Sequence, residues 1–179
     1  PIGCELTQTF ARLGAQVTQV ERGPRIMPRE DPEVSAMVAE RFRAEGVRLL
    51  LEHQAKQFVI EQGEKILVAE HAGSAVRIPF DGLLVALGRI GNLSGYGLEE
   101  LGIAGERTVA INEFLQTRYP NIYAAGDVAG PFQFTHTAAH QAWYASVNAL
   151  FAPFRSFRAD YSVIPWSTFV EPAVARVRL

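Results

Sequence analysis

The feature that most constrains this fold is a Gly-Asp pair placed between a short apolar run and a helical pattern. Residues 122–125 are apolar and β-prone, the run ends at Gly126-Asp127, and a helical pattern of about fifteen residues begins near Thr135. This order predicts a carboxylate and several free backbone N–H groups at one edge of a sheet. Such an edge can hold a ribitol or ribose hydroxyl on Asp127 and a partial negative charge at the helix N-terminus. A Gly-Asp pair alone is usually only a turn, so the interpretation depends on the rest of the chain.

An alternation of helix and strand patterns precedes this motif. Residues 3–14 are predicted to form a helix, and residues 16–21 a short strand. Asp31 and Pro32 are typical of a helix start, and that helix is expected to run to Gly46. Four strands are then predicted, the last three as an antiparallel meander: residues 47–51, 57–61, 65–70 and 76–80. The order predicts an α/β fold, a Rossmann-like three-layer nucleotide-binding domain with an antiparallel β-meander.

The second half of the chain is expected to contain fewer regular elements. Residues 81–89 have the pattern of a buried strand that ends at Gly88-Arg89, and a short helix is predicted around residues 98–101. The final helix is expected over residues 135–150, and residues 161–169 look like the first strand of a further unit.

Composition and charge exclude several classes of protein. With 179 residues, 48% hydrophobic and 20% charged, the chain has the composition of one globular domain or two small ones. A net charge of −2 gives no electrostatic reason to expect nucleic acid as a partner, and no apolar run is long enough to span a membrane. The single cysteine, Cys4, excludes an internal disulfide and a two-cysteine redox centre within the chain, and it favours a reducing compartment, the cytoplasm.

The first residues resemble the end of a dinucleotide-binding loop. Gly3 stands where the third glycine of a G-x-G-x-x-G loop would allow close packing of helix and strand. Glu21 lies 18 residues after Gly3 at the end of the next predicted strand, where an acid can bind ribose hydroxyls. A helix start followed by a surface glutamate is an equally simple interpretation. Arg22 and Arg25 lie close by and could bind a 2′-phosphate instead, so the pattern only slightly favours NAD over NADP.

Two further patterns have simple structural interpretations. Glu5 is an acid in the first turn of a helix, where the helix dipole favours negative charge. His136 and His140 have a spacing that can bind zinc, but residue 137 is Thr rather than the Glu of a metalloprotease helix. No third ligand is evident, so we predict a packed or hydrogen-bonded histidine pair and no metal site.

In this order, the motifs resemble those of the flavin-dependent pyridine nucleotide–disulfide oxidoreductases, the family of dihydrolipoamide dehydrogenase, glutathione reductase and mercuric reductase. The resemblance rests on four segments: residues 1–5, 85–89, 122–127 and 164–169. It implies that residues 1–88 form an NAD(P)-binding domain without its first strand and its first two loop glycines. Residues 89–155 would be the returning part of an FAD-binding domain, and residues 156–179 the start of an α+β dimerisation domain.

The resemblance also implies roles for residues of the NAD(P) domain. Gly3 would pack the NAD(P) helix against its strand, and Glu5 would lie near the nicotinamide-side ribose and the flavin. Glu21 would bind the adenosine ribose. Gly88 would end the strand that leaves this domain.

In the FAD domain, the resemblance implies contacts with the flavin. Gly126 and Asp127 would bind the ribityl chain through the aspartate. The helix that opens at Thr135-His136 would direct its N–H groups to the pyrimidine edge of the flavin, where negative charge develops on reduction.

The function implied is that of an FAD-dependent NAD(P)H:disulfide-type oxidoreductase, a homodimer with a small-molecule or dithiol substrate and a role in cell redox homeostasis. The redox cysteine pair and the catalytic His–Glu pair of this family would lie outside these 179 residues. We therefore expect an internal fragment with no catalytic residue, inactive alone. Two alternatives stay open: an FAD-dependent NAD(P)H oxidase or ferredoxin-reductase-like enzyme, and a non-catalytic nucleotide-binding module.

Overall fold

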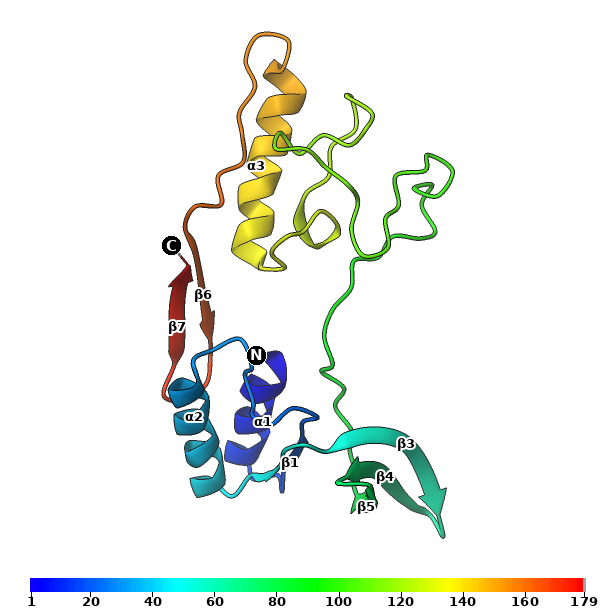
Figure 1. Ribbon diagram of the computed structural model, residues 1–179, viewed down its shortest axis with the longest axis vertical. Coiled ribbons are helices and arrows are strands. Elements are labelled where there is room, and N and C mark those ends of the chain that lie inside the picture. Colours follow the sequence, from blue (N-terminus) through cyan, green and yellow to red (C-terminus); the bar gives the residue numbers. More distant parts are fainter. Residues whose placement is uncertain (179) are drawn as a thin grey trace. The chain divides into compact units, whose positions relative to one another are not determined.

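A computed structural model describes residues 1–178, which divide into two compact units (Figure 1). Unit 1 comprises residues 1–87 and 167–175. Unit 2 comprises residues 88–166 together with the segment that begins at Arg176. No helix of the described residues is both long enough and apolar enough to cross a membrane.

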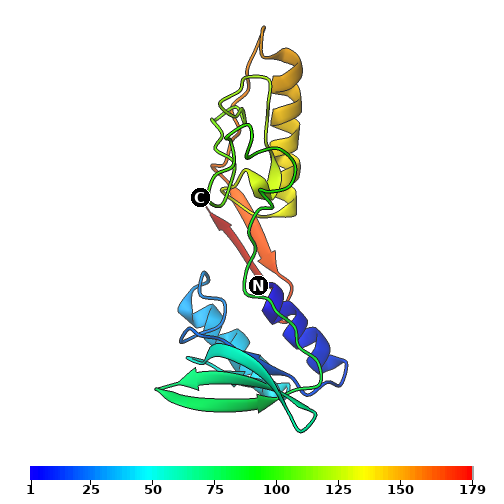
Figure 2. The same ribbon diagram turned by 90° about the vertical axis from the view of Figure 1, so that its right-hand side faces the viewer.

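Two helices and a pair of parallel strands build the centre of unit 1. Helix α1 (Ile2–Arg12) is followed by β1 (Thr18–Val20), α2 (Pro32–Ala44) and β2 (Arg48–Leu50), and β1 pairs in parallel with β2. Figures 1 and 2 show α1 and α2 side by side, and apolar side chains of both helices share one core with side chains from three other segments. That core consists of Cys4, Ile26, Met27, Val38, Ala39, Phe42, Val47, Val170 and Val174. The predicted alternation of helix and strand is confirmed.

The predicted meander is also present in unit 1. Strands β3 (Gln54–Glu61), β4 (Glu64–His71) and β5 (Ser74–Pro79) pair in antiparallel order, as Figure 2 shows. Both hairpin turns place two consecutive residues in the left-handed region, which matches the twist of the strands. Leu67, Ala69 and Ile78 form a second apolar cluster, against which side chains from β1 and β2 pack.

Unit 2 contains one long helix and loops that are tied to it. A single 3-10 turn, η1 (Gly126–Val128), precedes helix α3 (Thr135–Phe151), which begins at the predicted residue. The buried side of α3 carries polar side chains that bind loop backbone. Asn148 is fully buried, donates to the carbonyls of Phe114 and Phe157 and accepts from the N–H of Phe157. These bonds replace the hydrogen bonds that a sheet would provide.

The chain ends with two paired strands, β6 (Ile164–Thr168) and β7 (Val174–Arg178). Residues Ser167–Ala175 belong to unit 1, and Val170 and Val174 enter its core. The strand predicted over residues 161–169 is therefore present in a shorter form.

Three predictions from the second half of the sequence are wrong. Residues 81–89 form no strand, and Val85 and Leu87 are 64% and 89% exposed, because no described strand pairs with them. Residues 98–101 form turns instead of a helix. Residues 122–125 make one isolated bridge, between Gln116 and Tyr123, instead of a strand. An apolar run indicates β-propensity, but a strand also needs a neighbour for its backbone hydrogen bonds.

Candidate functional site

The first turn of α1 contains two of the predicted site residues, Gly3 and Glu5. The helix has Pro1 at its N-cap and no side-chain cap, so its first N–H groups have no partner within the helix. A Cβ atom on Gly3 would lie 3.4 Å from the Cβ of Ala86, so the helix approaches the segment after the meander closely at this residue. The segment around Ala86 forms no strand, so the packing of Gly3 against a strand stays a prediction.

Glu5 makes a contact that the sequence pattern did not predict. Its Oε1 accepts a hydrogen bond from the N–H of Phe169 at 2.9 Å, across 164 residues of sequence. The carboxylate is half-buried, and its orientation is set by the segment between β6 and β7. Glu5 is therefore more than an acid placed near a helix dipole.

Glu21 follows β1 directly, and the backbone around it is well ordered by hydrogen bonds. Its N–H donates to the carbonyl of Leu50, and its Oε1 accepts from the N–H of Gly23 at 2.9 Å. The N–H of Gly23 thus fixes one oxygen of the Glu21 carboxylate just after the strand. The described residues give the other oxygen no hydrogen bond. That geometry suits a carboxylate that accepts from a ribose diol.

The two arginines near Glu21 differ in their surroundings. Arg25 donates to the carbonyls of Pro28 and Glu30 at 2.9 and 2.8 Å, so its guanidinium is engaged by the backbone of its own loop. Arg22 is exposed. Of the two candidates for a 2′-phosphate, Arg25 is thus already used to hold the loop.

In unit 2, Gly126 and Asp127 form the predicted turn. Gly126 has φ of 81°, a left-handed conformation that favours glycine, and a Cβ atom there would lie 3.5 Å from Ala138 on α3. The Asp127 carboxylate forms an ion pair with Arg89 at 3.4 Å. Both side chains are partly exposed, so Asp127 keeps capacity to accept a further hydrogen bond.

Gln141 holds this turn, and the sequence analysis did not identify it. Its side chain is fully buried on α3, and its Oε1 accepts from the N–H of Gly126 at 2.6 Å. Its Nε2 donates to the carbonyl of Gly130 and to the hydroxyl of Tyr161, the latter at 2.9 Å. The sequence does offer one signal for Gln141. It lies four residues after Thr137, so the two polar side chains share one face of the helix.

The N-terminus of α3 presents Thr135 and His136, as predicted. Both are exposed, and the helix has no side-chain cap. The ring of His136 stacks on Phe134 with centroids 5.3 Å apart, and Phe134 stacks on Trp166 at 6.1 Å. The Oγ1 of Thr137, one residue further along, is buried without a hydrogen-bond partner in the described residues. The helix end therefore combines uncapped N–H groups with flat aromatic surface.

The histidine pair on α3 is used for packing. His140 donates through Nε2 to the carbonyl of Asp160 at 2.8 Å, and His136 stacks as described above. No group of three or more potential metal ligands occurs among the described residues.

Gly88 stands at the boundary between the units. Its φ of 130° is a conformation that favours glycine, it is exposed, and no atom lies within 4 Å of a Cβ placed on it. The strand that it was predicted to end is absent from the described structure.

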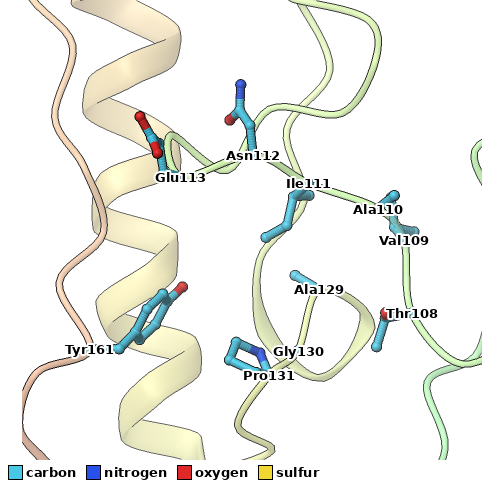
Figure 3. A pocket seen from close by; sticks show the side chains of 10 residues that line it. All are labelled: Thr108, Val109, Ala110, Ile111, Asn112, Glu113, Ala129, Gly130, Pro131 and Tyr161. Carbon is cyan, nitrogen blue, oxygen red and sulfur yellow. The ribbon is translucent and has the colours of Figure 1, made fainter.

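A pocket of about 470 Å³ lies in unit 2, beyond the Gly126–Val128 turn (Figure 3). Residues 108–113, residues 129–131 and Tyr161 line it. Figure 3 shows Tyr161 beside α3, and its hydroxyl is the one that accepts from Gln141. None of the eight predicted site residues, all of which the structure describes, lines this pocket. The pocket is therefore separate from the predicted flavin contacts.

The electrostatics of Cys4 argue against a reactive thiol. Cys4 lies in the core of unit 1, and burial raises the pKa of its thiol, an effect only partly offset by the amide of Gln19, 3.5 Å from the sulfur. A thiol with a raised pKa is a poor nucleophile at neutral pH. The described residues thus hold no redox-active cysteine pair.

Comparisons with known proteins show which family the chain matches. Residues 1–142 match the family described as pyridine nucleotide-disulphide oxidoreductase. A mercuric reductase of Acidithiobacillus ferrooxidans is 36% identical over 178 residues, and a dihydrolipoyl dehydrogenase of Mycobacterium leprae is 34% identical over 177 residues. The matches cover 98% and 97% of this chain but 31% and 38% of those proteins.

A solved structure shows the same fold. The Cu(II) complex of the HOCl-induced flavoprotein disulfide reductase RclA from Escherichia coli matches with a TM-score of 0.86 and 30% identity. The match covers 98% of this chain and 40% of that chain. The chain therefore spans less than half the length of the proteins that it resembles.

Proposed function

Because the chain belongs to the pyridine nucleotide-disulphide oxidoreductase family, we propose that it supplies the pyridine-nucleotide site and part of the flavin site of an oxidoreductase. The intact enzyme would pass electrons from NAD(P)H through FAD to a disulfide-type acceptor. Relatives named mercuric reductase and dihydrolipoyl dehydrogenase, and a neighbour titled flavoprotein disulfide reductase, support this class. They also make an NAD(P)H oxidase or a non-catalytic module the less favoured assignment.

The observation that carries the proposal is the geometry at the end of β1. Glu21 directly follows β1 and is held by the N–H of Gly23, which supports its proposed role as the acid that binds the adenosine ribose of a dinucleotide. The uncapped first turn of α1 supplies N–H groups and a positive dipole end for the pyrophosphate. Residues 1–88 are accordingly proposed as the NAD(P)-binding domain, and the change of compact unit between Leu87 and Gly88 supports that boundary.

We assign NADH as the preferred donor. A carboxylate at Glu21 repels a 2′-phosphate, and Arg25, which could have bound one, is engaged by the carbonyls of Pro28 and Glu30. Of the two arginines predicted there, Arg22 is the exposed one.

The flavin contacts are proposed for residues 89–155. Asp127 would accept a hydrogen bond from the ribityl chain, and the ion pair with Arg89 would orient its carboxylate. The N–H groups at Thr135 and His136 would stabilise negative charge at the pyrimidine edge through the dipole of α3. These groups fit a flavin, since the helix end is uncapped and the carboxylate is partly exposed. FAD, when bound, accepts hydride from the nicotinamide and passes the electrons on.

Residues 156–179 are proposed to take part in dimerisation, and the intact enzyme to act as a cytoplasmic homodimer on a small-molecule or dithiol substrate. The described residues contain no pair of cysteines, and Cys4 is buried. No residue of this chain is therefore assigned to the reduction of the acceptor.

The proposal is tested by an absorption spectrum and an FAD titration of the purified chain. We expect no stoichiometric flavin, no NADH-driven bleaching, and weak FAD binding that Asp127→Ala weakens further, by about fivefold. Glu106→Ala, at an exposed position of the same unit, is the matched control and should leave FAD binding unchanged. A tightly bound yellow cofactor in the isolated chain would contradict the proposal that it supplies only part of the flavin site. Equal FAD affinity in wild type and Asp127→Ala would contradict the role of Asp127.

A further inference from the structure

One face of α1 carries three polar side chains that all bind the segment between β6 and β7. Glu5, Gln8 and Arg12 are spaced three and four residues apart, so they lie on the same side of the helix. Their partners are the backbone of Phe169, the backbone of Glu171 and the carboxylate of Glu171. All five residues belong to unit 1.

Gln8 binds Glu171 in the way that a neighbouring strand would. Its Oε1 accepts from the N–H of Glu171 at 2.7 Å, and its Nε2 donates to the carbonyl of Glu171 at 3.0 Å. A residue of a β-ladder exchanges the same two bonds with the residue opposite. Gln8 is only 3% exposed, so loss of this amide would leave the N–H and the carbonyl of Glu171 without their partner.

The two bonds also determine where Phe169 lies. The N–H groups of Phe169 and Glu171 both face α1, because they donate to Glu5 and Gln8 on that helix. The N–H of Phe169 then donates to Glu5, one turn nearer the N-terminus of the helix than Gln8. Arg12 adds an ion pair with the carboxylate of Glu171 at 2.6 Å.

We propose that Gln8 is a positioning residue for the nicotinamide end of the dinucleotide site. By holding Glu171 it keeps the N–H of Phe169 on Glu5, and this bond fixes the Glu5 carboxylate at the first turn of α1. The inference rests on the proposed function, because it needs a dinucleotide at that turn. It adds a residue, Gln8, that would touch neither the cofactor nor the substrate and would act through Glu171, Phe169 and Glu5.

Two ligands separate this role from a general effect on the fold. NADH and ADP share the adenosine and pyrophosphate, but only NADH carries the second ribose and the nicotinamide and therefore reaches the Glu5 end of the proposed site. Dissociation constants for both are measured on the full chain by NMR titration. Gln8→Leu removes both hydrogen bonds at similar volume, and Gln57→Leu, at an exposed position on β3, is the matched control.

We expect Gln8→Leu to raise the Kd for NADH about fivefold or more, the effect of losing one net hydrogen bond, and to change the Kd for ADP less than about twofold. In the wild-type chain, NADH should shift the amide signal of Phe169 and ADP should not. Equal loss for the two ligands, or no change for either, would overturn the role of Gln8. If neither ADP nor NADH binds the wild-type chain, the proposed function fails, and the role of Gln8 fails with it.

A second variant keeps the test decisive if Gln8→Leu fails to fold. Gln8→Glu retains an acceptor for the N–H of Glu171 but loses the donor to its carbonyl. Its Kd for NADH should rise by about twofold to fivefold, with ADP binding unchanged. A Kd for NADH equal to that of wild type would overturn the proposal.

Discussion

Replacing Gln141 by Leu should destabilise unit 2 by removing the side chain that holds the Gly126-Asp127 turn. Leu has a similar volume and the same helix propensity or better, so the change acts on hydrogen bonds rather than on packing. Three bonds are lost, to the N–H of Gly126, the carbonyl of Gly130 and the hydroxyl of Tyr161. Gln141 is fully buried, so water does not replace them readily.

The magnitude follows from these three bonds. Each contributes about 1 kcal/mol net, which gives a loss of about 3 kcal/mol. Burial of the apolar Leu side chain in place of an amide returns about 1 kcal/mol. The free energy of unfolding of unit 2 should therefore fall by about 2 kcal/mol, which lowers the Tm of a unit of this size by about 10 °C.

Tryptophan fluorescence during urea unfolding is a suitable assay. Both tryptophans of the chain, Trp143 and Trp166, belong to unit 2, so their emission reports on that unit. Gln133→Leu, at a half-buried position just before α3, is the matched control and should change the free energy by less than about 0.5 kcal/mol. If Gln141→Leu also costs less than about 0.5 kcal/mol, the turn does not depend on this amide and the reasoning is refuted.

Three further predictions concern unit 1. Phe42→Ala, at a fully buried core position, should lower the free energy of unfolding by about 3–5 kcal/mol in urea titrations followed by circular dichroism, and a loss below about 1 kcal/mol would show that the core does not depend on this ring. Arg12, which hydrogen-bonds Glu45, lowers the pKa of that carboxyl from 4.5 to about 2, so this interaction stabilises the fold above pH 4.5 and is lost as the pH falls towards 2. Glu45→Gln should therefore be less stable than wild type at pH 7 and should converge with it on acidification, whereas a constant difference would contradict the ion pair. Cys4, whose thiol pKa is raised by burial, should resist alkylation by iodoacetamide at pH 8 until urea is added, and rapid labelling of the native chain would show that the core around it opens.

Local patterns in the sequence predicted much of unit 1. The start of α2 at Pro32 and the two tight turns of the meander depend on residues within a few positions of each other. Neighbouring residues alone determine these features, so a single sequence is sufficient. The start of α3 at Thr135 was found in the same way.

The contacts that shape the site could not be predicted from local sequence patterns. Glu5 meets Phe169 across 164 residues, and Gln141 meets Gly126 across 15. No periodicity links these residues, because their proximity results from the packing of whole elements. The prediction of a strand over residues 81–89 is wrong for the same reason. The apolar pattern indicates β-propensity but does not show whether a partner strand is present.

The central claim is that unit 1 binds a pyridine dinucleotide through Glu21, and binding of NADH and NADPH to wild type and to Glu21→Ala tests it most directly. We expect wild type to bind NADH more tightly than NADPH, and Glu21→Ala to raise the Kd for NADH about tenfold, because a hydrogen bond to a charged group is lost. The Kd for NADPH should stay within about twofold, since the 2′-phosphate does not gain from a carboxylate. Equal weakening of both nucleotides, or no weakening of NADH, would contradict the assignment of Glu21 to the ribose.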